Sequence, residues 1–128
     1  MKLMPVAVNF RDERGAITDL IEAEEINAVT LVTFTKGAIR ANHFHQHTVQ
    51  YNYLLSGSIE LVTQMPDGPR QSAVLGPREL AAVGEMEHHA LRALEDSELL
   101  VFTRGPRGGK EYETDTFRLE TPLISEEA

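Results

Sequence analysis

Hydrophobic and polar residues alternate along most of this chain, in short segments separated by turn residues. The alternation has the two-residue period of a β-strand, whose successive side chains point to opposite faces. No long segment has the period of an amphipathic helix, although residues 17–26 could form a short helix instead of a strand. The pattern therefore predicts an all-β protein of about ten short strands, either a sandwich or a barrel.

The expected strands are bounded by turns rich in glycine, proline and acidic residues, of which Met65–Pro69 is the strongest. One strand is expected to begin after Gly37 and to carry the first histidines, with the chain reversing direction over residues 46–48. The others cover residues 6–10, 16–21, 28–35, 49–55, 58–63, 70–75, 80–83, 88–93, 98–104 and 115–119. No repeat, linker or low-complexity tract interrupts them, so we expect a single domain over residues 1–128.

All five histidines lie in two short stretches: His43, His45 and His47, then His88 and His89. The first three share one face of their expected strand. Neutral imidazole is the commonest metal ligand in proteins, and two hairpins of a closed β-fold could bring both stretches together. The clustering predicts a metal site, with surface histidines as the alternative. Such a metal should be lost as the pH falls through about 6, where an ordinary imidazole gains a proton.

Composition limits the metal and the partners. The chain has no cysteine, so imidazole and oxygen ligands would hold a divalent Zn, Fe, Ni, Mn or Cu ion. The net charge of −8 argues against nucleic acid and anionic membranes as partners. No apolar run approaches the ~20 residues that span a bilayer. Without cysteines or a signal-like apolar start, the chain is expected to be cytoplasmic.

A loop rich in glycine and proline carries three cations, Arg104, Arg107 and Lys110. Loops of this kind stay on the surface and often carry function. We expect the three cations to flank a cavity and attract an anionic small molecule. The alternative is a positively charged surface turn.

The first histidine stretch resembles the first conserved motif of the cupin superfamily. That motif is a glycine, five residues, His-x-His, three or four residues, a glutamate, six residues and a glycine. Its positions correspond here to Gly37, His43, His45, Gln50 and Gly57, with glutamine in place of the glutamate. The second cupin motif is matched more loosely by residues 76–93, where Ala82-Val83-Gly84 replaces Pro-x-Gly and Ala93 replaces an asparagine.

The resemblance implies a cupin double-stranded β-helix, a jelly-roll barrel, with a metal inside it. The implied ligands are His43, His45, Gln50 and His89. His88 is the alternative to His89, which is preferred because it shares a strand face with Leu91 and Ala93. His47 could contribute only if the chain bends, because by the ~3.3 Å rise per residue it lies too far along the strand from the first histidine.

A narrower resemblance rests on Asp12-Glu13-Arg14-Gly15 and on residues 40–45. These look like the RmlC-like cupins of deoxysugar biosynthesis, which include dTDP-4-dehydrorhamnose 3,5-epimerases and nucleotide-sugar ketoisomerases. That resemblance implies acid and base groups acting on a ketosugar. The candidates are His43 or His45 as the base and Tyr53 or Tyr112 as the acid.

Three functions compete at this stage. The first is a metal-dependent enzyme, such as a dioxygenase, acting on a small anionic or carbonyl-containing metabolite. The second is a nucleotide-sugar isomerase or epimerase with little or no metal role, and the third is a non-catalytic ligand-binding cupin. The expected substrate-binding residues are Arg40, Asn42, Asn52, Arg104 and Arg107. Tyr51 and Tyr53 are expected to face outward, which favours a homodimer.

Overall fold

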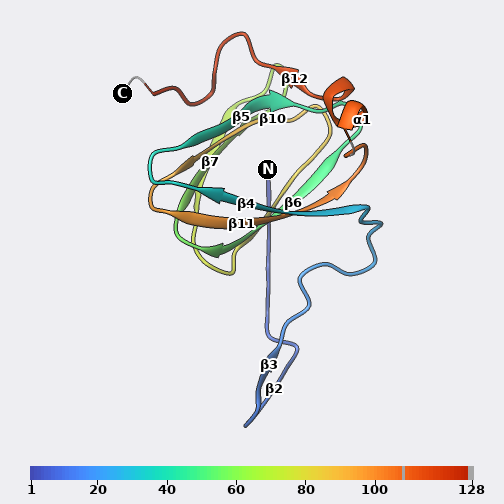
Figure 1. Ribbon diagram of the computed structural model, residues 1–128, viewed down its shortest axis with the longest axis vertical. Coiled ribbons are helices and arrows are strands. Elements are labelled where there is room, and N and C mark those ends of the chain that lie inside the picture. Colours follow the sequence, from blue (N-terminus) through green and yellow to red (C-terminus); the bar gives the residue numbers. More distant parts are fainter. Residues whose placement is uncertain (108, 127–128) are drawn as a thin grey trace.

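The protein consists of two five-stranded antiparallel sheets packed face to face, seen in a computed structural model that describes residues 1–107 and 109–126 (Figure 1). The first sheet has the order β1-β9-β6-β11-β4 and the second β12-β5-β10-β7-β8. The strands are β1 (Lys2–Met4), β2 (Phe10–Asp12), β3 (Gly15–Ile17), β4 (Ala28–Phe34), β5 (Ile39–Phe44), β6 (Val49–Ser56), β7 (Ile59–Gln64), β8 (Arg70–Leu75), β9 (Leu80–Val83), β10 (His88–Ala93), β11 (Ser97–Arg104) and β12 (Phe117–Arg118). The predicted all-β class is confirmed.

The largest departures from the expected elements lie near the two ends of the chain. Strand β1 was not expected, and the expected strand over residues 6–10 begins only at Phe10. Strands β2 and β3 form a separate hairpin that projects from the barrel (Figure 1). Residues 18–26 form neither helix nor strand, and a short helix, α1 (Gly109–Thr114), begins at the end of the expected cationic loop and continues beyond it. Among the described residues, no helix is long and apolar enough to cross a membrane.

The core lies between the inner faces of the two sheets. On the inner face of β6, Gln50 and Asn52 precede Leu54, which is fully buried. On the opposite sheet, Ile59 and Leu61 of β7 are also fully buried. The polar residues of these faces gather toward one end of the sandwich and the aliphatic ones toward the other. The barrel is therefore filled at one end and lined with polar groups at the other.

The outer face of the first sheet is covered by the chain itself. Tyr51 and Tyr53 point outward, as their strand alternation predicts, but their exposed fractions are only 5% and 9%. They pack with Met4, Val6, Leu20, Ile21 and Ile26 of the N-terminal segment. The expected dimer interface assumed that both tyrosines are exposed, and this assumption is wrong. The homodimer stays a prediction, which light scattering on the purified protein would test.

Gly57, the last glycine of the cupin-like motif, has a structural reason for its lack of a side chain. Its φ of 94° lies in the region that disfavours residues with a Cβ. A Cβ added at Gly57 would lie 2.1 Å from Ser97 Oγ and 2.5 Å from the main-chain oxygen of Asp96. The turn between β6 and β7 can therefore pack against the start of β11 only if this residue is glycine.

Candidate active site in the barrel

A bulge in β5 places the first histidine of the site. His89 pairs with His43, but the next residue, Ala90, pairs with Ala41, so Asn42 is an extra residue in β5. Ala41 and Asn42 have φ values of 71° and 54°, which are uncommon for residues other than glycine. Because the bulge breaks the strict alternation of the strand, Arg40 and His43 can face the same cavity although three positions separate them.

Three histidines converge inside the barrel. His43 comes from β5, His45 follows the end of that strand, and His89 comes from the neighbouring strand β10. The ring centroid of His43 lies 4.7 Å from those of both His45 and His89, which are 5.5 Å apart from each other. One nitrogen from each ring can be chosen so that the three lie within 4.8 Å of one another, and all three side chains are buried.

Main-chain carbonyl groups orient two of these rings. His45 Nδ1 lies 2.8 Å from the main-chain oxygen of Asp115, and His89 Nδ1 lies 3.0 Å from that of Glu87. A carbonyl oxygen only accepts hydrogen bonds, so each Nδ1 carries the proton and each Nε2 keeps its lone pair. His45 Nε2 is buried and has no hydrogen-bond partner among the described residues. The site therefore contains a buried, unsatisfied acceptor that a metal or a donated proton would satisfy.

His43 and His89 are neutral at ordinary pH. Burial, followed by the charges that His89, His45 and Arg118 would exert, lowers the pKa of His43 to about 3. Burial, followed by His45 and His88, lowers the pKa of His89 to about 3. A positive charge on a neighbouring ring would repel a proton, so His43 and His89 are each harder to protonate than a free histidine. Neutral imidazoles of this kind can accept a proton or bind a metal.

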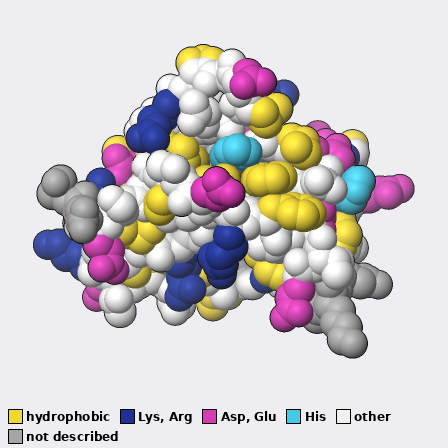
Figure 2. Space-filling view, turned by 90° about the horizontal axis from the view of Figure 1, so that it is seen from above, with side chains coloured by type: hydrophobic (Ala, Val, Ile, Leu, Met, Phe, Trp, Pro, Cys, Tyr) yellow, Lys and Arg dark blue, Asp and Glu magenta, His cyan; other side chains and the backbone are white. Residues whose placement is uncertain are grey.

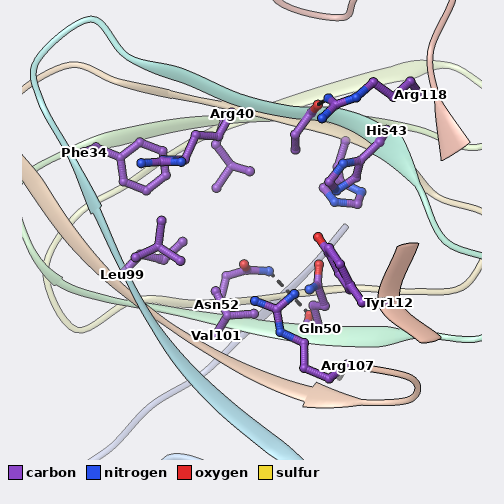
Figure 3. A pocket seen from close by; sticks show the side chains of 14 residues that line it. Phe34, Arg40, His43, Gln50, Asn52, Leu99, Val101, Arg107, Tyr112 and Arg118 are labelled. Atoms are coloured by element: carbon purple, nitrogen blue, oxygen red, sulfur yellow. Dashed lines mark hydrogen bonds between the residues drawn. The ribbon is translucent and has the colours of Figure 1, made fainter. Parts of the chain in front are cut away.

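A cavity of about 260 Å³ opens beside the histidines (Figure 3). It is lined by Val32, Phe34, Arg40, Ala41, His43, Gln50, Asn52, His89, Leu91, Leu99, Val101, Arg107, Tyr112 and Arg118. Phe34 and Leu99 lie at one end, and His43 and Tyr112 lie at the other. Arg40 lies beside Phe34, with its guanidinium carbon 5.2 Å from the centroid of that ring. The cavity therefore combines apolar walls with a few polar groups, an arrangement typical of small-molecule sites.

Three arginines surround this cavity, each held by an uncharged partner. Arg40 donates to the main-chain oxygen of Thr33 at 3.0 Å, and Arg107 Nε donates to Thr30 Oγ1 at 3.3 Å. Arg118 lies 3.5 Å from the main-chain oxygen of Ala41. No carboxylate is among the described residues that line the cavity. The outer surface is less segregated, since acidic and basic side chains are mixed on the face shown in Figure 2.

Tyr112 and Gln50 lie across the cavity from the histidine strand (Figure 3). The Tyr112 ring lies 5.6 Å from the His45 ring, and the Arg107 guanidinium carbon lies 4.3 Å from the centroid of the Tyr112 ring. Gln50 belongs to β6, so the four residues that the cupin resemblance proposes as ligands come from both sheets. Asn52 faces the cavity and donates to the main-chain oxygen of Ala81 at 3.2 Å.

The remaining residues proposed from the sequence lie elsewhere. Arg104 forms an ion pair with Glu24 at 2.8 Å and is not part of the cavity lining. The Asn42 side chain binds the main chain of Leu123 and Ile124, which holds the C-terminal segment against β5. Of the three cations in the loop, only Arg107 is in the described cavity lining. The side chain of Lys110 lies outside the described part of the structure.

The other two histidines are outside the cluster. His47 is exposed in the turn before β6, and His88 stacks on Phe44, with 4.7 Å between ring centroids. Because His88 and His89 are adjacent in a strand, only one of them can face the cavity, and that residue is His89. Tyr53, one of the two proposed acids, lies on the outer face of the first sheet, whereas Tyr112 faces the cavity.

Two residues at the site were not proposed from the sequence. Arg118 reaches the cavity because β12 pairs with β5, and Asp115 lies 4% exposed in the turn after α1. The Asp115 carboxylate accepts hydrogen bonds from the main-chain nitrogens of Gln46 and His47 and from Thr48 Oγ1. The only sequence signal for either residue was the weak alternation over residues 115–119, which carries no information about the partner strand.

The three-histidine cluster is chemically suited to a divalent transition metal. It offers three imidazoles, and the carbonyl groups that bind Nδ1 of His45 and His89 are the usual outer partners of metal-binding histidines. The unsatisfied Nε2 of His45 is the group that such an ion would occupy. His43, His45 and His89 would hold the metal, and Gln50 could add a neutral oxygen from the facing sheet.

Comparisons with known proteins place the fold. No protein-family model and no curated protein sequence matches the chain. Among solved structures, it is similar to the TDP-quinovose 3,4-ketoisomerase WlaRB of Campylobacter jejuni, with a TM-score of 0.78, 18% identity and 92% of each chain covered. The chain has the cupin fold. The expected resemblance to deoxysugar epimerases and ketoisomerases is thereby confirmed at the level of structure.

Two further structures match this chain over most of its length. The sugar 3,4-ketoisomerase QdtA of Thermoanaerobacterium thermosaccharolyticum, in complex with TDP, has a TM-score of 0.77 and 21% identity, over 93% of this chain and 88% of QdtA. The dTDP-4-dehydrorhamnose 3,5-epimerase of Sulfolobus tokodaii has a TM-score of 0.73 and 16% identity, over 96% of this chain and 89% of the epimerase. At such identities the likeness concerns the fold.

Proposed function

We propose that this cupin is an isomerase or epimerase that shifts a proton on the keto form of a phosphate-bearing sugar, such as a nucleotide-linked ketosugar. The structurally similar proteins include 3,4-ketoisomerases and a 3,5-epimerase of such sugars. The observation that carries the proposal is the composition of the cavity. Neutral imidazoles and a phenol face a space surrounded by three arginines, with no carboxylate in the described lining.

This composition suits an anionic carbonyl compound. The guanidinium groups of Arg107 and Arg118, near the histidine end, attract phosphate oxygens in a chain whose net charge is −8. Within the described lining, no carboxylate repels such a substrate. Phe34 and Leu99 offer apolar surface to an uncharged part of the sugar, with the Arg40 guanidinium group beside Phe34.

His43 is the proposed base. In its neutral state it takes a proton from the carbon next to the carbonyl group, and the electron pair of that bond forms an enol or enolate. The Tyr112 hydroxyl, at the same end of the cavity as His43, donates a hydrogen bond or a proton to the carbonyl oxygen. Return of the proton to the former carbonyl carbon, with loss of the neighbouring hydroxyl proton to the Tyr112 oxygen or to water, forms the new carbonyl group and completes an isomerisation. An epimerisation instead needs a proton delivered to the opposite face of the same carbon by a donor on that side. The negative charge of the bound substrate favours protonated His43 and raises its pKa during the reaction.

Proton exchange tests the proposal directly. TDP-4-keto-6-deoxyglucose incubated with the protein in D₂O should incorporate deuterium beside the carbonyl group and form an isomer, both visible by NMR. His43→Gln should lower this rate by about 10²- to 10⁴-fold. His47→Gln is the matched control, because His47 is exposed and outside the cluster. A panel of TDP- and UDP-ketosugars without exchange above the buffer rate would refute the proposal.

A metal-dependent enzyme is the second candidate, favoured by the convergence of three imidazoles and the unsatisfied His45 Nε2. A divalent ion held by His43, His45 and His89 would act as a Lewis acid on a bound carbonyl or carboxylate group. Elemental analysis of the purified protein and exchange rates after treatment with a chelator distinguish the two. Full activity of the metal-free protein supports the first candidate, and activity that returns only with added metal supports the second.

A further inference from the structure

A second polar groove lies outside the barrel, between the β2–β3 hairpin and the outer face of the first sheet. Its volume is about 440 Å³, larger than that of the cavity between the sheets. Its polar lining consists of Arg11, Thr18, Tyr53 and Arg78, all of which can donate hydrogen bonds. The hairpin that forms one wall projects from the barrel (Figure 1). The groove therefore combines two guanidinium groups and two hydroxyl groups, with no acidic residue in its described lining.

The nearest acidic residues in the sequence do not neutralise these arginines. Asp12 follows Arg11, but its carboxylate is bound by Arg14 at 2.6 and 3.0 Å. Glu79 follows Arg78, but its Oε1 accepts a hydrogen bond from the main-chain nitrogen of Gly76 at 2.6 Å. None of the ion pairs within the described residues includes Arg11 or Arg78. Two uncompensated cations at one groove are unusual in a chain with 20 acidic residues against 12 lysines and arginines.

The backbone at Arg78 is that of a glycine position. Glu79 donates a main-chain hydrogen bond to Gly76 at 3.2 Å, which closes a β-turn with Pro77 second and Arg78 third. The φ of Arg78 is 71°, and a turn with positive φ at its third position normally has glycine there. An arginine at this position strains the backbone and makes no side-chain hydrogen bond within the described chain. The guanidinium group at this turn is therefore available to a ligand in the groove.

We propose that Arg11 and Arg78, with the hydroxyl groups of Tyr53 and Thr18, form a second anion site that binds a phosphate group. Two guanidinium groups and two hydroxyl donors suit a tetrahedral, doubly charged oxyanion better than a planar carboxylate. Because Arg11 belongs to the hairpin and Arg78 to the barrel, a bound phosphate would tie the hairpin to the first sheet. The site is separate from the cavity between the sheets and does not depend on the reaction proposed there.

Inorganic phosphate is the probe, titrated at low ionic strength and pH 7.5 and followed by amide chemical shifts. The titration uses a variant with the substitutions Arg107→Gln and Arg118→Gln, which weaken anion binding at the cavity between the sheets. Amide signals of residues 10–18 and 76–80 should shift, and Arg11→Gln or Arg78→Gly should each weaken binding by about tenfold. Arg14→Gln is the matched control, because Arg14 is on the same hairpin but is paired with Asp12. Acetate at equal concentration should bind more weakly than phosphate.

Arg78→Gly also separates binding from stability. Glycine relieves the strain of the turn, so this variant should melt about 3 °C higher while it loses phosphate affinity. Unchanged affinity in Arg78→Gly, an equal loss in Arg14→Gln, or acetate binding as tight as that of phosphate would each overturn the proposal. Amide shifts confined to the cavity would overturn it too. A lower melting temperature of Arg78→Gly would show that the Arg78 side chain stabilises the turn itself, and this result would also overturn the proposal.

Discussion

His45 Nδ1 donates a hydrogen bond to the main-chain oxygen of Asp115, 2.8 Å away and 70 residues further along the chain. The carboxylate of the same aspartate accepts hydrogen bonds from the turn at residues 46–48. Asp115 thus joins the end of the histidine strand to the segment that carries Tyr112 and Arg118. The geometry of the histidine cluster depends on this contact between two distant parts of the chain.

Removal of the Asp115 carboxylate should destabilise the protein. Burial would raise the pKa of Asp115, but the hydrogen bonds from Thr48, Gln46 and His47 together hold it below its usual value. Asp115→Ala leaves those buried donors unsatisfied, and we expect the free energy of unfolding in urea to fall by about 2–4 kcal/mol. Asp115→Asn should recover part of the loss. Asp19→Ala, at an exposed position, is the control and should change stability by less than about 0.5 kcal/mol.

The free energy of unfolding should depend on pH through His43 and His89, the two buried histidines whose pKa is lowered. The folded pKa of His43 and of His89 is about 3, whereas an unfolded histidine titrates near 6.5. Between these values the unfolded state binds more protons, so stability falls as the pH falls. The expected slope is about 1.4 kcal/mol per pH unit for each histidine, well below pH 6.5. Urea midpoints from pH 8 to pH 4 would measure it.

A matched pair of variants identifies the histidine that causes this slope. His89→Gln removes one titrating group and should flatten the curve, whereas His47→Gln, at an exposed position, should leave it unchanged. Equal slopes in both variants would contradict the assignment. The same lowered pKa values also affect metal binding. The lowered pKa of His43 and His89 would let these two ligands keep a metal at a lower pH than ordinary imidazole does. Metal loss near pH 6 stays a prediction, which metal content measured against pH would test.

Arg107 and Arg118, which line the cavity, should contribute more to substrate binding than Arg104, which lies outside it. Arg107→Gln and Arg118→Gln should each weaken an anionic substrate about tenfold, because each removes a charged donor from the cavity lining. The sequence alone suggested pairing Arg107 with Arg104. Arg104→Gln now serves as the control, because that side chain pairs with Glu24 outside the cavity. Calorimetry with TDP would compare the three variants, and an equal effect of Arg104→Gln would point to general charge attraction.

The variant Gln50→Glu should distinguish a metal-dependent enzyme from one that transfers protons without a metal. A carboxylate in the cavity lining adds one negative charge near the three imidazoles. A metal site with a neutral Gln50 should gain affinity, while an anionic substrate should bind more weakly because of repulsion. Metal competition assays and TDP binding measure both effects. Parent-like results in both assays would mean that residue 50 contacts neither ligand.

The histidine pair and the all-β class could be predicted from the sequence because both depend on local properties. The two-residue period of a strand and the turn residues between strands act over a few neighbours. They predicted β4 to β11 within a few residues, and they place His89 rather than His88 on the inner face. The glycine at position 57 also followed from its motif, and its tight contact with Ser97 supplies the reason.

Tertiary structure decided which residues meet at the cavity. The bulge at Asn42 arises where the C-terminal segment binds its side chain, and it brings Arg40 to the face of His43. Tyr112 and Arg118 reach the cavity only because the segment after β11 folds back over β5. Tyr53 is buried because the N-terminal segment covers it. These contacts join positions far apart in the chain, so their free energy comes from packing and long-range hydrogen bonds, which no short window of sequence contains.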